Sequence, residues 1–169
     1  MSPIFEILLA LASIAGVFVG FGALVVLSDH GAARISEMHS VRAVVLIGII
    51  TLVGALTPVG LGSFELSDRV LWGWSGGAFL VLIWFSLTHS TNRPVLLTMM
   101  RTDLKASLFF WLVLEPPIQI PLLFCIFGTF PQHAPAFYVV AVVVNLFQCA
   151  LTLVQVVFAR VQRLGDGSP

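Results

Sequence analysis

Residues 7–27 read ILLALASIAGVFVGFGALVVL, a run of 21 residues without a charged side chain. At 1.5 Å per residue, a helix of this length reaches across the ~30 Å hydrocarbon core of a bilayer. A cleaved signal peptide has a positively charged start and a shorter apolar core, but no Lys or Arg precedes this run. We therefore expect a retained transmembrane helix near the start of the chain.

The composition of the whole chain agrees with this expectation. Of the 169 residues, 59% are hydrophobic and 9% are charged, against roughly 25% charged residues in an average soluble domain. The mean hydropathy is +1.06 and the formal net charge is zero. A soluble domain of this size leaves too much of its surface outside to hide so many apolar side chains. The composition excludes a soluble enzyme, a nucleic-acid binder and a disordered chain.

Five apolar segments are long enough to cross a bilayer. A backbone in lipid must satisfy its own hydrogen bonds, and the alternating pattern of a membrane barrel is absent. We therefore predict an all-α fold, an integral membrane bundle of five transmembrane helices in a single domain over residues 1–169. The predicted helices are 4–28, 42–63, 70–88, 108–130 and 136–159.

The basic residues orient these five segments. With five crossings, one side of the membrane receives seven basic residues and the other receives only Arg69. Four crossings would split them five to three, which is a weaker bias. By the positive-inside rule, we expect the N-terminus outside and the C-terminus in the cytoplasm. The seven residues are Arg34, Arg42, Arg93, Arg101, Lys105, Arg160 and Arg163. Within the longest loop, residues 89–107, we expect a short helix lying in the membrane interface.

Glu115 is the one charged residue deep inside a predicted span. A charge at the centre of a bilayer costs at least about 2.5–3.5 kcal/mol on insertion scales, so an intramembrane carboxylate suggests a function by default. Pro116, Pro117 and Pro121 lack N–H groups, which predicts a kink with open backbone carbonyls, among them those of Leu112 and Val113. Gln119 lies four residues after Glu115 and shares its helix face.

The last predicted helix offers a matching polar stripe, because its polar residues are spaced three, four and three positions apart. Antiparallel packing would join Glu115 to Thr152 and Gln119 to Gln148. The stripe consists of Asn145, Gln148, Thr152 and Gln155.

These polar residues also have a purely structural interpretation. Polar side chains often join membrane helices, each contributing about 0.6 kcal/mol. Glu115 could be protonated and donate to a carbonyl that a proline has freed. Small residues at Ala12, Gly16 and Gly20 follow four-residue steps and indicate helix packing. In the second span, Thr57 and Pro58 predict a kink in which the threonine hydroxyl covers a freed carbonyl.

Three stretches together indicate a resemblance to known proteins. They are residues 14–21 (IAGVFVGF), residues 115–122 (EPPIQIPL), and residues 136–138 with 145–147. On these, the chain resembles a group of small, uncharacterised bacterial multi-pass membrane proteins that carry a Glu-x-Pro-Ile-Gln segment in the fourth span. The resemblance implies a bacterial inner-membrane protein. It implies no activity and no role for any residue.

The sequence leaves several functions open. The first is an oligomeric channel or transporter subunit that moves protons or small ions past Glu115, since five helices alone enclose little space. The alternative is a non-transporting scaffold, sensor or accessory subunit with a membrane-protein partner. An intramembrane enzyme ranks last, because one carboxylate without a nucleophile or a second acid–base group does not make up a catalytic site. We expect no cofactor and no metal, because no metal-ligand or nucleotide-binding motif occurs.

Overall fold

The computed structural model describes residues 2–27, 35–88 and 110–165, which form helices and short turns without a strand. Four long helices are α1 (Pro3–Leu27), α2 (Ile35–Leu61), α3 (Asp68–Thr88) and α7 (Ala134–Gly165). The shorter α6 (Pro116–Phe127) follows a π-helical turn, η2 (Phe110–Leu114). Two 3₁₀ turns are η1 (Gly62–Phe64) and η3 (Pro131–His133).

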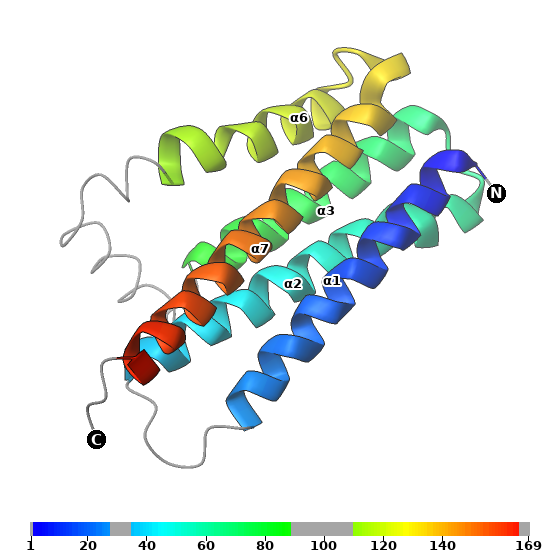
Figure 1. Ribbon diagram of the computed structural model, residues 1–169. Helices are drawn as coiled ribbons and strands as arrows, with labels where there is room; N and C mark the ends of the chain where they lie inside the picture. The colour runs from blue at the N-terminus through cyan, green and yellow to red at the C-terminus, as the bar shows by residue number, and fades with distance from the viewer. Residues whose placement is uncertain (1, 28–34, 89–109, 166–169) are drawn as a thin grey trace.

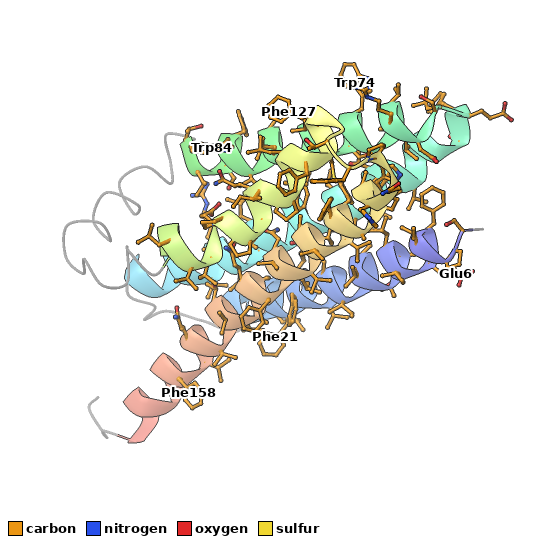
Figure 2. All side chains as sticks on the ribbon, turned by 90° about the horizontal axis from the view of Figure 1, so that it is seen from above. Glu6, Phe21, Trp74, Trp84, Phe127 and Phe158 are labelled. Atoms are coloured by element: carbon orange, nitrogen blue, oxygen red, sulfur yellow. The ribbon has the colours of Figure 1, made fainter. Side chains whose placement is uncertain are left out.

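The helices alternate in direction along the bundle. The start of α1, the turn η1 and the turn η3 lie at one end, and the last residues of α1, α3 and α7 lie at the opposite end (Figure 1). α7 packs against α1, α2 and α6, while α6 also packs against α3. Large apolar side chains cover the outside of the bundle, among them Trp74, Phe127 and Phe158 (Figure 2).

Four helices in the described part are long and apolar enough to cross a membrane, and α6 is a shorter apolar helix. This is the pattern of a membrane-embedded helical protein, in which exposed apolar side chains face lipid. The predicted boundaries of the first and third helices differ from the observed ones by one or two residues.

Other predicted boundaries differ more. The helix predicted at 108–130, with a kink at its prolines, is interrupted at Glu115 and ends at Phe127, because the prolines withhold two N–H groups and Gly128 adopts a left-handed conformation with φ 62°. The span predicted at 42–63 agrees with the apolar stretch Val41–Phe64, but its helix begins earlier, at Ile35. The predicted helix 136–159 begins at Ala134 and continues to Gly165. The residues added at the start of α2 and at the end of α7 form helix readily, although they are too polar to lie within a membrane span.

Some predictions fall outside the described residues. These are the interfacial helix within residues 89–107 and the positions of Arg34, Arg93, Arg101 and Lys105.

Aromatic rings fill the core near the η1 and η3 end. Tyr138 of α7 packs against Trp72 and Phe79 of α3, with ring centroids 5.6 and 5.9 Å apart. Phe79 also lies against Gly54 of α2, where a Cβ atom would come within 2.7 Å of the ring. Glycine is therefore required for the close contact of α2 with α3.

Candidate functional site

Glu115 stands at the junction between the π-helical turn and α6. Its side chain is only 4% exposed. The Gln119 Nε2 atom donates a hydrogen bond to the Glu115 carboxylate over 2.8 Å, one helical turn along the same helix. The backbone N–H groups of Ile118 and Gln119 both donate to the backbone carbonyl oxygen of Glu115 at 3.0 Å. The carboxylate is thus held by its own helix.

Glu115 and the turn before it are followed directly by two prolines. Pro116 and Pro117 have no N–H, so the carbonyls of Leu112 and Val113 lack their normal helical donors. Within the described part of the chain, no side chain donates to either carbonyl. A π-helical turn inside an α-helix is uncommon and often marks a functional position. Glu115 is therefore bordered by hydrogen-bond acceptors that no described side chain satisfies.

Thr152 forms a different hydrogen bond from the predicted one, and Asn145, for which no partner was predicted, bonds to α2. The Asn145 Nδ2 atom donates to the Thr51 hydroxyl of α2 at 2.7 Å. The Thr152 hydroxyl donates to the Gln148 backbone carbonyl of its own helix at 2.9 Å. Gln155 is exposed. Among the hydrogen bonds of the described residues, neither Glu115–Thr152 nor Gln119–Gln148 occurs, since the other helix ends shift the register that we assumed.

Gln148 is buried without a partner for its amide nitrogen. Its side chain is 5% exposed, and Nε2 has no hydrogen-bond acceptor. Cys149, the next residue, faces α2 and lies near Gly48, where α1 also approaches. Gln148 is turned by about 100° from Cys149 around α7, away from α1. It therefore faces the side on which α3 and α6 pack.

The turn between α6 and α7 fixes their register. The Cys125 thiol donates to the Ala134 carbonyl over 3.3 Å, so these two residues are level in the antiparallel pair. Counting ten residues from each places Glu115 level with Val144, next to Asn145. Gln148 lies one turn further along α7. Side chains lean toward the N-terminus of their own helix, so Glu115 and Gln148 lean toward each other's level.

The sequence analysis missed the roles of Thr51 and Tyr138. Pro58 removes the helical donor of the Gly54 carbonyl, and the Tyr138 hydroxyl of α7 replaces that donor at 2.5 Å. We expected the Thr57 hydroxyl to cover the freed carbonyl, but it donates to Val53 at 2.7 Å. The sequence signals for this contact were Pro58 in one span and Tyr138, the single tyrosine of the chain, in another.

The small residues of α1 differ in their surroundings. Ala12 is buried, and a Cβ at Gly16 would contact Leu52 of α2 at 3.7 Å. Gly20 is exposed, with no atom within 4 Å of such a Cβ. The close contact of α1 with α2 near this point is made at Gly22, which faces Val45.

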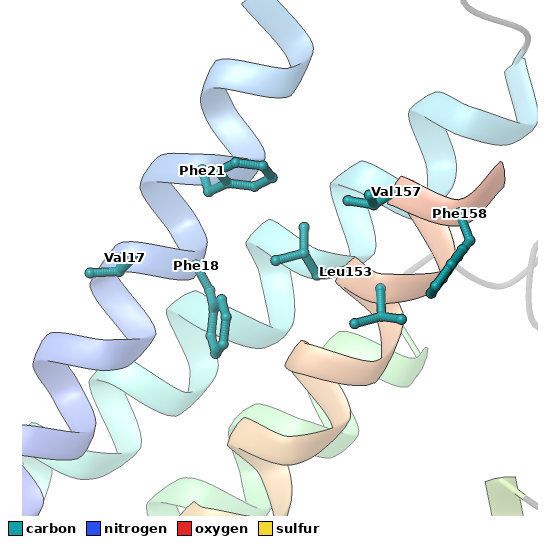
Figure 3. A pocket seen from close by; sticks show the side chains of 7 residues that line it. Val17, Phe18, Phe21, Leu153, Val157 and Phe158 are labelled. Atoms are coloured by element: carbon teal, nitrogen blue, oxygen red, sulfur yellow. The ribbon is translucent and has the colours of Figure 1, made fainter. Parts of the chain in front are cut away.

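An apolar groove of about 300 Å³ lies between α1 and α7 (Figure 3). Its lining offers no hydrogen-bonding side chain, so it provides only van der Waals contact and no chemistry. Residues 2–27, 35–88 and 110–165 contain no group of three or more His, Cys, Asp or Glu side chains that could hold a metal ion. The lining residues are Val17, Phe18, Phe21, Leu153, Val154, Val157 and Phe158.

In comparisons with known proteins, no family model, no curated protein and no solved structure matches this chain. The chemistry of the buried residues is therefore the basis for a functional conclusion. That chemistry centres on one buried carboxylate, the open carbonyls before it and an unpartnered amide on the facing helix.

Proposed function

We propose that this protein is a subunit of an oligomeric membrane channel or transporter that moves protons or small cations, with Glu115 as the group that carries them. The N-terminus lies outside and the C-terminus in the cytoplasm of a bacterial inner membrane. The observation that carries the proposal is the 4% exposed Glu115 carboxylate at an interrupted helix.

The hydrogen bonding of Glu115 favours this role over a purely structural one. A polar residue that joins helices forms its bond across the interface, as Asn145 does with Thr51. The Glu115 carboxylate instead bonds to Gln119 on its own helix. Since a buried carboxylate is costly in lipid, a carboxylate that joins no other described helix supports a function other than packing.

The proposal is tested by reconstituting the purified protein into liposomes and measuring proton and cation flux. We expect wild-type flux and a strong loss in Glu115→Gln, which keeps the side-chain shape but removes the ionisable group. Glu6→Gln is the matched control, since Glu6 is exposed on α1. Loss of flux in both variants, or in neither, would contradict the role of Glu115.

The topology is tested separately with reporter tags at the two ends of the chain. The five helices alternate in direction, so five crossings place the termini on opposite sides of the membrane (Figure 1). Tags that report the same side would exclude five crossings. If wild-type protein shows no flux and instead copurifies with one membrane protein in fixed ratio, the accessory role holds.

A further inference from the structure

We infer that Gln148 and Glu115 form one hydrated site between α6 and α7, and that the species bound there is a proton carried by water rather than an alkali cation. This inference deepens the proposed function and rests on it. It starts from the Gln148 amide nitrogen, which is buried and has no acceptor.

An unpaired buried donor destabilises a protein unless a water or ligand accepts its hydrogen bond. The facing helix offers an acceptor at the matching level. One oxygen of the Glu115 carboxylate receives the Gln119 bond, and the other has no hydrogen bond within the described residues. An unpaired donor on α7 and an unpaired carboxylate oxygen on the facing helix thus lie at matching levels of two helices that pack together.

Water is the occupant that fits both groups. A water molecule accepts from the Gln148 N–H and donates to the Glu115 carboxylate. These two groups supply two polar partners, and a buried water makes two to four hydrogen bonds.

The nature of the flanking groups distinguishes a proton from a metal cation. Alkali and alkaline-earth cations require a shell of oxygen ligands. Among the described residues assigned to this site, the oxygen without a hydrogen bond belongs to the Glu115 carboxylate, whereas the Gln119 and Gln148 amides present N–H groups. An N–H repels a metal cation but hydrogen-bonds to water and to a carboxylate. The site therefore favours a proton on Glu115 over a metal ion beside it.

The transfer needs no further reactant. A hydronium ion on one side loses a proton to the Glu115 carboxylate, so one O–H bond of hydronium breaks and the carboxyl O–H bond forms. On the other side, the carboxyl O–H bond breaks and the proton passes to a water near Gln148. Glu115 returns to its starting state, and one proton has moved.

The experiment uses liposomes that contain a pH-sensitive dye, in buffers whose only cation besides the proton is N-methylglucamine. Gln148→Leu replaces the amide with an apolar side chain and so removes the donor, and Gln132→Leu in the exposed turn η3 is the matched control. We expect full wild-type proton flux without Na⁺ or K⁺. Gln148→Leu should lower it about tenfold, as loss of a hydrogen bond to a charged group does. Glu115→Gln should lower it at least about a hundredfold.

Infrared spectroscopy gives a second measurement that does not depend on flux. The carboxyl C=O band that disappears in Glu115→Gln belongs to Glu115. We expect Gln148→Leu to shift this band and Gln132→Leu to leave it in place. The band and the flux together separate a positional change at Glu115 from a folding defect.

Each result has one consequence. Flux that Glu115→Gln abolishes but Gln148→Leu leaves unchanged, with no band shift, overturns the shared site and leaves the proposed function intact. Flux that requires Na⁺ or K⁺ overturns the proton as substrate and again leaves transport intact. Absence of any wild-type flux overturns both proposals.

Discussion

The bundle contains two proline sites with opposite outcomes. In α2, Pro58 frees the carbonyl of Gly54, and Tyr138 from α7 bonds to it. In η2 and α6, Pro116 and Pro117 free carbonyls to which no described side chain donates, and Glu115 beside them bonds to its own helix. The first site joins helices and the second does not. A freed backbone carbonyl is thus bonded across helices in α2, whereas in η2 no described side chain donates to the freed carbonyls.

The largest effect on stability should come from closing the tight contact at the first site. Gly54→Ala places a Cβ within 2.7 Å of the Phe79 ring, which overpacks the core and should lower the free energy of unfolding by about 2 kcal/mol. Gly60→Ala on the same helix is the control, because no atom lies within 4 Å of its Cβ position. It should leave stability unchanged or raise it. Unfolding in mixed micelles measures both, and equal effects would refute the contact.

The next effect tests whether Tyr138 replaces the donor that Pro58 removes. Tyr138→Phe leaves the Gly54 carbonyl buried and unpaired, and should cost about 1 kcal/mol of unfolding free energy. Pro58→Ala restores a backbone N–H that can reach the same carbonyl. In that background Tyr138→Phe should cost less. An unchanged cost in the double variant would show that the hydroxyl acts in some other way.

A smaller effect is expected for the bond between α2 and α7 at the next level. A double-mutant cycle of Asn145→Ala and Thr51→Ala should give a coupling energy of about 0.6 kcal/mol, the average for polar contacts between membrane helices. In Asn145→Ala the Thr51 hydroxyl retains its own bond to the Ile47 carbonyl at 2.8 Å, so this single variant should be mild. A coupling energy of zero would remove this bond from the packing of the interface.

The same comparison explains what the sequence could predict. The Glu115–Gln119 bond follows from a four-residue spacing on one helix, which needs no knowledge of any neighbour. The all-helical, apolar architecture follows from composition and segment length in the same way. Hydrogen-bond partners on other helices could not be predicted in this way. Thr152 was assigned to Glu115 by counting from a predicted helix end at 159, but α7 continues to Gly165.

Cross-helix partners depend on helix rotation and register, which packing at Gly54 and the Cys125–Ala134 contact determine. Neither of these two contacts can be inferred from the spacing of polar residues along the sequence. The stripe on α7 illustrates this, because its members diverge in space: Asn145 faces α2, Gln148 faces the α3 and α6 side, and Gln155 is exposed. Residues of one periodic pattern on a helix therefore lie in three different surroundings.

The smallest expected change separates the two proline sites most sharply. Glu115→Gln preserves the side-chain shape and an oxygen that accepts the Gln119 bond, so the free energy of unfolding should change by less than about 0.5 kcal/mol. A loss of stability comparable to that of Tyr138→Phe would mean that the carboxylate holds the bundle together. Unchanged stability with lost flux would mean that the α2–α7 contacts maintain the fold and that the ionisable group of Glu115 serves transport alone, in agreement with a side-chain hydrogen bond that stays within its own helix.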